Sequence, residues 1–168
     1  MATAAAVPIE EFWKLVEQGE LVEYVDGEVI ERPMALLIHG KIQASFGDRL
    51  RKSMEPFGGT AAVNVHCRLG ERKMRLPNIV AYDRPMPDYE YPDLPALVTV
   101  EVAAPSDRFS DLLRKCQEYA DWRVPHIWMI DPERRGLYEF SSGRLRPVES
   151  FSIPEYGIAF SPADIFPG

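Results

Sequence analysis

Residues 96–104, with the sequence ALVTVEVAA, form the most continuous apolar run of the chain. A short run of this composition, rich in β-branched residues, predicts a strand that is covered on both faces. Glu101 interrupts the run. A buried carboxylate without a partner is costly. Glu101 therefore predicts either a metal-binding or catalytic role, or a structural ion pair with a core-facing Arg or Lys.

The segments before and after this run alternate between helical and strand patterns of apolar residues. The expected order is helix, hairpin, helix, several strands, helix, strand and closing hairpin. Their residues are 9–19, 21–31, 35–54, 60–69, 74–82, 96–104, 106–122, 126–131 and 137–148. This order predicts an α/β fold of the α+β kind, in which a mixed β-sheet is flanked by helices and preceded by an N-terminal helix and hairpin.

Turn and cap residues mark several of these boundaries. Asp26-Gly27 supplies the positive φ angles that a tight two-residue turn needs. Ser106 and Asp107 are candidate N-caps for the third helix. The proline-rich stretch 83–95 predicts a loop with little regular structure.

The length and composition of the chain are those of one soluble domain. Its 168 residues are expected to form a single domain, 1–168. Hydrophobic residues make up 46% and charged residues 27%, and no apolar run approaches the roughly 18 residues that a membrane span needs. The first seven residues, MATAAAV, lack the features of a secretory signal. We therefore expect a cytoplasmic protein with no membrane partner.

Net charge, cysteines and motifs narrow the function classes. The net charge of −7 argues against a general affinity for nucleic acid, although it leaves room for a local basic groove. Cys67 and Cys116 lie in different expected elements, and we interpret both as buried, reduced thiols. The sequence contains no G-x-S-x-G elbow, P-loop, dinucleotide fingerprint or H-E-x-x-H motif, so no enzyme class with those signatures is indicated.

Three further polar residues lie on apolar faces of expected elements. Asn78 is either a local hydrogen-bonding group or a ligand. Lys115 lies at the border of the apolar stripe of the third helix, where a lysine ordinarily extends its head group to water. Glu23 lies on the apolar face of the first hairpin strand, where an edge position can leave it solvated. None of the three indicates a function alone.

Taken together and in order, several segments resemble the Uma-type restriction endonucleases (DUF820), a branch of the PD-(D/E)XK nuclease superfamily. The segments are VEYVDGE at 22–28, LPNIVAY at 76–82, VEVAAPSD at 100–107, LLRKCQEYADWRVPHIWMIDP at 112–132 and SPADIF at 161–166. The resemblance covers nearly the whole chain. Its specificity comes from the combination of a proline-led strand, EV-x-x-PSD, a helix with a lysine and a W-x-x-DP strand.

The resemblance implies a restriction-endonuclease-like core in which an Asp after a Pro, and a Glu on the next strand, bind Mg²⁺ or Mn²⁺. A water on such an ion can attack a phosphodiester. The matching metal ligands are Glu101 and, at the Asp position, Asn78. Position 103 is Ala, so the usual E-x-K lysine is absent, and Lys115 on the following helix is the match. Glu23 matches an additional catalytic acid.

The resemblance also implies a nucleic-acid partner. His39 matches a family histidine with a structural or substrate-contact role, and Arg108 is a second candidate substrate contact near the site. DNA is the expected partner, and a homodimer is expected by analogy with nucleases that cut two strands. Basic residues within 49–52 and 68–75 either support a nucleic-acid partner or are ordinary solvated charges.

The chain departs from the family pattern at Pro77-Asn78, where the pattern has Pro-Asp. An amide oxygen can coordinate a metal but brings no negative charge, so weaker Mg²⁺ occupancy is expected. Two hypotheses follow. The chain is a metal-dependent DNA endonuclease that Asn78 weakens or inactivates, or it is a catalytically degenerate nuclease-fold protein that acts as a nucleic-acid-binding or assembly module.

Overall fold

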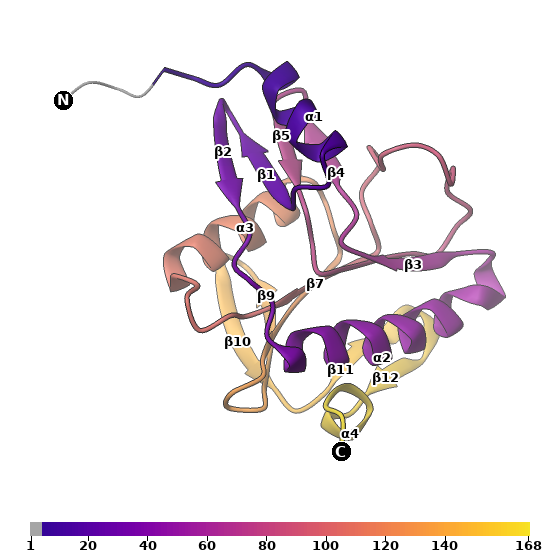
Figure 1. The fold of residues 1–168 in the computed structure, drawn as a ribbon. Coiled ribbons are helices and arrows are strands. Elements are labelled where there is room, and N and C mark those ends of the chain that lie inside the picture. Colours follow the sequence, from indigo (N-terminus) through magenta and orange to yellow (C-terminus); the bar gives the residue numbers. More distant parts are fainter. Residues whose placement is uncertain (1–4) are drawn as a thin grey trace.

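The computed structural model describes residues 5–168, so the first four residues of the MATAAAV stretch lie outside the described part. The helices are α1 (Ile9–Glu17), α2 (Leu37–Met54), α3 (Phe109–Asp121) and α4 (Pro162–Ile165), with 3-10 turns at Glu55–Phe57 and Pro154–Tyr156. The strands are β1 (Val22–Val25), β2 (Glu28–Glu31), β3 (Thr60–Val63), β4 (Cys67–Gly70), β5 (Lys73–Arg75), β6 (Ile79–Tyr82), β7 (Val98–Val102), β8 (His126–Asp131), β9 (Gly136–Ser141), β10 (Arg144–Val148), β11 (Phe151–Ile153) and β12 (Ile158–Phe160). The expected mixed α/β fold is confirmed (Figure 1).

Two larger sheets and one small pair make up the β-structure of the described residues. The six-stranded sheet has the order β10-β9-β8-β7-β6-β3, and the four-stranded sheet has the order β2-β1-β5-β4. The third is the β11–β12 pair. In Figure 1, α1 lies against the four-stranded sheet, whereas α2 and α3 lie on opposite faces of the six-stranded sheet.

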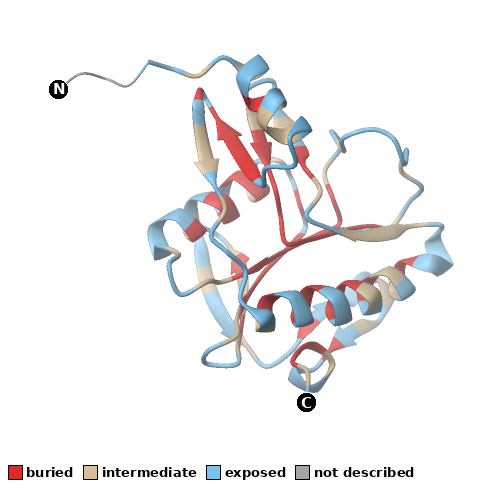
Figure 2. Cartoon of the chain, viewed as in Figure 1, coloured by how far each residue is buried: buried red, intermediate tan, exposed pale blue. Residues whose placement is uncertain are grey.

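β7 lies in the middle of the six-stranded sheet, as its apolar sequence predicts. It pairs antiparallel with β6 and parallel with β8, and all of its residues are buried (Figure 2). Val98 and Val100 pack with Phe46 and Trp128 in the core on the α2 side. Because successive strand side chains point to opposite faces, Glu101 points to the α3 side.

The two expected strands 60–69 and 74–82 are each divided between two sheets, so the expectation of single strands is wrong. β3 and β6 belong to the six-stranded sheet, and β4 and β5 to the four-stranded sheet. Asn64, with a φ of 51°, interrupts the first segment, and Pro77, which has no N–H, interrupts the second. Asn78 consequently lies at the junction of the sheets.

The third helix begins later than its expected caps. α3 has Arg108 at the N-cap position without a side-chain cap, so the expected caps Ser106 and Asp107 are wrong. Asp107 Oδ2 instead accepts a hydrogen bond of 2.7 Å from the Ala104 N–H and closes the turn before the helix. Phe109, the first residue of α3, is 63% exposed and takes no part in the buried apolar stripe.

The expected β1–β2 turn, the expected loop and the expected buried thiols are confirmed. Asp26 and Gly27 have φ angles of 49° and 96° in the β1–β2 turn, and residues 83–95 contain no helix or strand. Cys67 and Cys116 are free and buried. No helix within residues 5–168 is long and apolar enough to cross a membrane.

Candidate functional site

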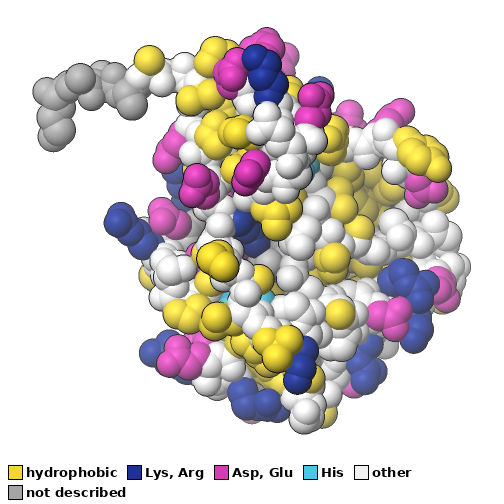
Figure 3. All heavy atoms as spheres, viewed as in Figure 1, with side chains coloured by type: hydrophobic (Ala, Val, Ile, Leu, Met, Phe, Trp, Pro, Cys, Tyr) yellow, Lys and Arg dark blue, Asp and Glu magenta, His cyan; other side chains and the backbone are white. Residues whose placement is uncertain are grey.

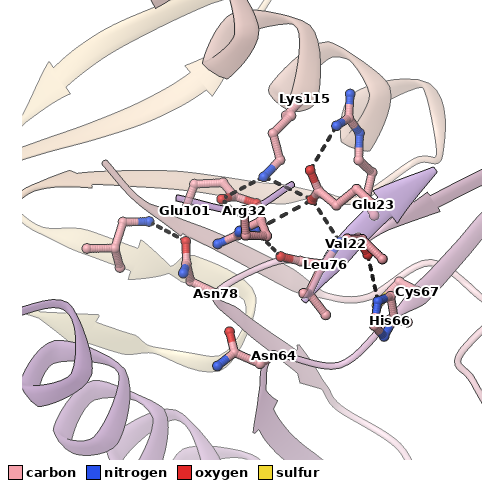
Figure 4. Close-up of polar contacts among 12 residues, drawn as sticks. Val22, Glu23, Arg32, Asn64, His66, Cys67, Leu76, Asn78, Glu101 and Lys115 are labelled. Atoms are coloured by element: carbon pink, nitrogen blue, oxygen red, sulfur yellow. Dashed lines mark hydrogen bonds and ion pairs between the residues drawn. The ribbon is translucent and has the colours of Figure 1, made fainter. Parts of the chain in front are cut away.

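The candidate site lies where β1, the end of β7 and α3 meet. Glu23 is on β1, Glu101 on β7 and Lys115 on α3, while Asn78 directly precedes β6. None of these four residues is more than 8% exposed. All four line one cleft of about 790 Å³. The structure therefore brings together the four residues that the sequence assigned to catalysis (Figure 4).

Lys115 lies between two carboxylates that come from different sheets. Its Nζ is 3.1 Å from Glu23 Oε1 and 3.1 Å from Glu101 Oε2. Figure 4 shows the ammonium group pointing from α3 between the two acids. The ordinary interpretation of this position, in which the lysine extends its head group to water, is therefore wrong. The head group faces two buried anions instead.

Glu23 is held by donors on both of its oxygens. Oε1 accepts a hydrogen bond of 2.9 Å from the Leu76 N–H, and Oε2 accepts one of 3.0 Å from Arg75 Nη1. Arg32 Nη1 lies 3.5 Å from Oε1. Glu23 is 2% exposed, so it is not the solvated edge charge that its position allowed.

Glu101 is also fully partnered. The Tyr119 hydroxyl donates to Oε1 at 2.7 Å, and Oε2 faces both Lys115 and Arg32 Nη1, the latter at 3.8 Å. The structural ion pair considered for this residue is therefore present. It does not exclude a chemical role, because the residue also lines the cleft.

Asn78 faces Glu101 across the β6–β7 pair. The register of that pair matches Ile79 with Val100. Extended by one residue, it places Asn78 opposite Glu101 on the same face. The Asn78 Oδ1 accepts a hydrogen bond of 2.8 Å from the Val102 N–H. The amide therefore acts as a local hydrogen-bonding group at the end of β7, and one lone pair of its oxygen is already used.

The two predicted substrate contacts occupy different positions. His39 on α2 is 4% exposed, and its Nε2 lies 2.8 Å from the Ala103 carbonyl oxygen, which fixes α2 to the end of β7. That contact supports the structural role that was left open for this histidine. Arg108 is exposed, lines the cleft and makes no ion pair with the described residues, so it remains available to a ligand.

Sequence reasoning missed four residues of the site: Arg32, Arg75, Glu118 and Tyr119. Arg75 joins Glu23 to Glu118, whose Oε2 is 2.5 Å from Arg75 Nε. Glu118 and Tyr119 lie three and four positions after Lys115, so helical spacing could have placed them beside it. Nothing in the local sequence distinguishes Arg32 or Arg75 from surface arginines.

The cations around Glu23 control its protonation. Burial works to raise the pKa of Glu23, but the charges of Lys115, Arg32 and Arg75 and the Leu76 N–H outweigh burial and lower the pKa to about 2. For Tyr119, burial and the neighbouring Glu101 carboxylate raise the pKa well above its usual value. Tyr119 therefore remains a protonated donor to Glu101.

The lowered pKa of Glu23 predicts acid sensitivity. A carboxyl group with a lower pKa in the folded state stabilises the fold above its unfolded pKa, and this contribution is lost as the pH falls toward 2. We expect Glu23→Gln to lower the free energy of unfolding at pH 7 by about 3 kcal/mol and to flatten its decline between about pH 5 and pH 2. Urea unfolding across this pH range measures both effects, with the exposed Glu133→Gln as control. An unchanged pH profile in Glu23→Gln would contradict the assignment.

The residues present do not fit a firmly held divalent metal. Within residues 5–168, no three His, Cys, Asp or Glu side chains form a cluster that could hold a metal ion. Glu23 and Glu101 face the cations Lys115 and Arg32, so their charge is already neutralised. Asn78 adds no charge. Because Mg²⁺ is bound largely through charge and gives up its waters reluctantly, we expect these donors to bind it weakly.

A mixed sheet flanked by helices, with acidic residues and a lysine gathered at the end of its central strand, defines the class of nuclease-like α/β folds. The chain belongs to the Uma2 family, described as "Putative restriction endonuclease", whose model matches residues 9–167. The family that the sequence resembles is thereby confirmed.

A crystal structure shows the same fold. It is that of a "putative nuclease belonging to DUF820" from Anabaena variabilis ATCC 29413. The match has a TM-score of 0.80 at 18% sequence identity and covers 95% of this chain and 97% of the other. None of the curated proteins matches the chain.

Proposed function

We propose that this chain is a nuclease-fold protein that binds DNA without hydrolysing it. The observation that carries the proposal is the state of the expected metal ligands. The oxygen of Asn78, which stands at the Asp position, accepts the Val102 N–H, and the Glu101 carboxylate faces Lys115, Arg32 and the Tyr119 hydroxyl. A site neutralised in this way lacks the negative charge that a catalytic divalent ion requires.

DNA is the proposed partner because the family description names restriction endonucleases. The exposed Arg108 at the start of α3 offers a phosphate contact in the cleft. The acidic side chains lining the cleft are Glu20, Glu23, Glu28, Glu31, Glu101, Asp107 and Asp111, and the basic ones are Arg32, Arg75, Arg108, Arg114 and Lys115. In Figure 3 acidic side chains gather over α1 and the β1–β2 hairpin at the top of the view. Because acids outnumber bases in the cleft, binding should be weak, and because it relies on contacts to phosphate it should weaken as the salt concentration rises.

The cluster of basic residues at 49–52 gives DNA binding less support than its sequence suggested. At the end of α2, Arg51 and Lys52 pair with Asp48, and Arg49 pairs with Asp164. These cations are compensated locally, which favours the interpretation of ordinary surface charges for this cluster.

The homodimer stays a prediction that light scattering would test.

A cleavage assay tests the proposal. Supercoiled plasmid incubated with Mg²⁺ or Mn²⁺ is expected to remain supercoiled in the presence of the natural chain, and equally so in the presence of Glu101→Ala. Fluorescence anisotropy with a labelled duplex is expected to show binding that weakens as salt rises. Nicking by the natural chain that is abolished in Glu101→Ala would overturn the proposal, and so would an absence of binding at low salt.

The second candidate is a metal-dependent DNA endonuclease of low activity. The convergence of Glu23, Asn78, Glu101 and Lys115 in one cleft favours it, as does the excess of acids in the lining, which would attract divalent cations. It predicts slow nicking that rises with metal concentration. The same plasmid assay, carried to high Mn²⁺ concentration, separates the two candidates.

A further inference from the structure

Arg32 directly follows β2 and sends its guanidinium into the site. Its side chain is 13% exposed. Nη1 donates a hydrogen bond to the Leu76 carbonyl oxygen and lies 3.5 Å from Glu23 Oε1 and 3.8 Å from Glu101 Oε2. One cation therefore touches an acid of each larger sheet, and also the segment that leads into Pro77 and Asn78.

The guanidinium of Arg32 lies among the acids of the site, where a bound metal cation would also be expected. It lies beside Glu101, and Glu101 is the cross-strand neighbour of Asn78. Figure 4 shows the guanidinium close to the Leu76 carbonyl, in the region of the site where Glu101 and Asn78 lie. Within the described residues, the hydrogen bonds of this guanidinium use Nη1 alone. A carboxylate at position 78 would enter this neighbourhood as a partner for Arg32, whereas the neutral amide of Asn78 does not.

The charges of the site balance without a metal ion. The acids Glu23, Glu101 and Glu118 are buried, and the cations facing them whose side chains are at most 13% exposed are Arg32, Arg75 and Lys115. A divalent ion added to this group would leave an excess of two positive charges in a poorly solvated place, which is unfavourable.

We infer that Arg32 is the resident cation of this site, in the place that a divalent metal would require, and that Arg32 and Asn78 exclude the metal jointly. The inference rests on the proposed function, because it explains why the natural chain lacks the metal. It goes beyond the loss of one ligand, since it assigns the exclusion to a second residue that sequence reasoning did not consider.

The joint action follows from the charge of each variant. In Asn78→Asp four carboxylates face the three cations Arg32, Arg75 and Lys115, so a divalent ion would leave an excess of one positive charge. In Arg32→Met the guanidinium is gone but the amide at position 78 remains neutral. Three carboxylates then face Arg75 and Lys115, and a divalent ion would again leave an excess of one positive charge. In the double variant four carboxylates face the buried cations Arg75 and Lys115, and one divalent ion balances the two remaining negative charges. Hard oxygen ligands with this charge are what Mg²⁺ and Mn²⁺ bind.

The test is the Mn²⁺ affinity of four proteins, measured by calorimetry at pH 7. The natural chain is expected to bind Mn²⁺ with a dissociation constant of about 1 mM or weaker. Each single variant is expected to bind Mn²⁺ less than about tenfold more tightly than the natural chain. The double variant Asn78→Asp/Arg32→Met is expected to gain about 100-fold or more, so the two changes are coupled. A matched control combines Asn78→Asp with Arg144→Met, which removes an exposed arginine on β10 outside the cleft, and it should behave as Asn78→Asp alone.

The outcomes separate the inference from the proposed function. Tight Mn²⁺ binding by the natural chain would overturn the proposed function. If the natural chain binds no Mn²⁺, two outcomes would overturn the role of Arg32. One is an equal Mn²⁺ affinity of Asn78→Asp and the double variant, and the other is a folded double variant that binds no Mn²⁺. If circular dichroism shows that Arg32→Met prevents folding, Arg32→Gln replaces it, because its amide can still donate to the Leu76 carbonyl. The same affinities are then expected.

Discussion

The Arg75→Met variant is expected to lose about 3–5 kcal/mol of unfolding free energy, because removal of one partner leaves buried charges uncompensated. Arg75 on β5 is 2% exposed and bonds Glu23 on β1 and Glu118 on α3, at 3.0 and 2.5 Å. Among the residues that the structure describes, its loss leaves Glu118 with the more exposed Lys73 and Arg114 as partners. The ion pairs of Arg75 also tie the four-stranded sheet to α3, so the effect extends beyond one contact.

Arg68→Met provides the matched control for Arg75→Met. Arg68 is exposed on the neighbouring strand β4 and makes no ion pair with the described residues, so its replacement should change stability by less than about 0.5 kcal/mol. Urea unfolding at pH 7 followed by circular dichroism measures both variants. Equal stability of the two would show that the Glu23–Arg75–Glu118 network does not hold the fold together.

The Asn78→Asp/Arg32→Met variant is expected to nick supercoiled plasmid in the presence of Mn²⁺ at a rate on the order of 10²–10³ times the background rate measured with the natural chain. Single electrostatic groups at reaction centres contribute effects of this size. The physical reason is the restored negative charge beside Glu101 together with the removal of the competing guanidinium. Lys115 remains in contact with both acids in the natural arrangement, so its position needs no change.

Two controls accompany this gain of activity. The triple variant that adds Glu101→Ala should lose the nicking, and each single change should give far less of it than the double. Mn²⁺ binding by the double variant without any nicking would mean that the site has lost more than its metal, and the account of its inactivity through Asn78 and Arg32 would then be incomplete.

Much of the fold could be predicted because its strongest signals are local. The apolar run around β7, the β8 segment and the Asp26-Gly27 turn each have a pattern that specifies one conformation. The division of residues 60–69 and 74–82 between two sheets could not be predicted in the same way. Both halves of each segment are extended and partly apolar, and only the sheet to which each half pairs distinguishes them.

The site shows the same division between local and long-range information. The positions of Glu23, Asn78, Glu101 and Lys115 could be proposed from motifs and from their unusual apolar surroundings. Arg32 could not, because a charged residue after a hairpin strand is ordinary, and only the fold brings it to Glu101, 69 positions away. The hydrogen bond from the Val102 N–H to Asn78 likewise depends on the register of β6 with β7.

Calorimetric titration of the natural chain with Mg²⁺ tests the central claim most directly. If Arg32 and Lys115 neutralise the acids and Asn78 supplies no charge, the titration shows only heat of dilution up to about 1 mM Mg²⁺. Saturable binding at micromolar Mg²⁺ that disappears in Glu101→Gln would contradict the claim. It would show that the natural site holds its metal despite the amide at position 78.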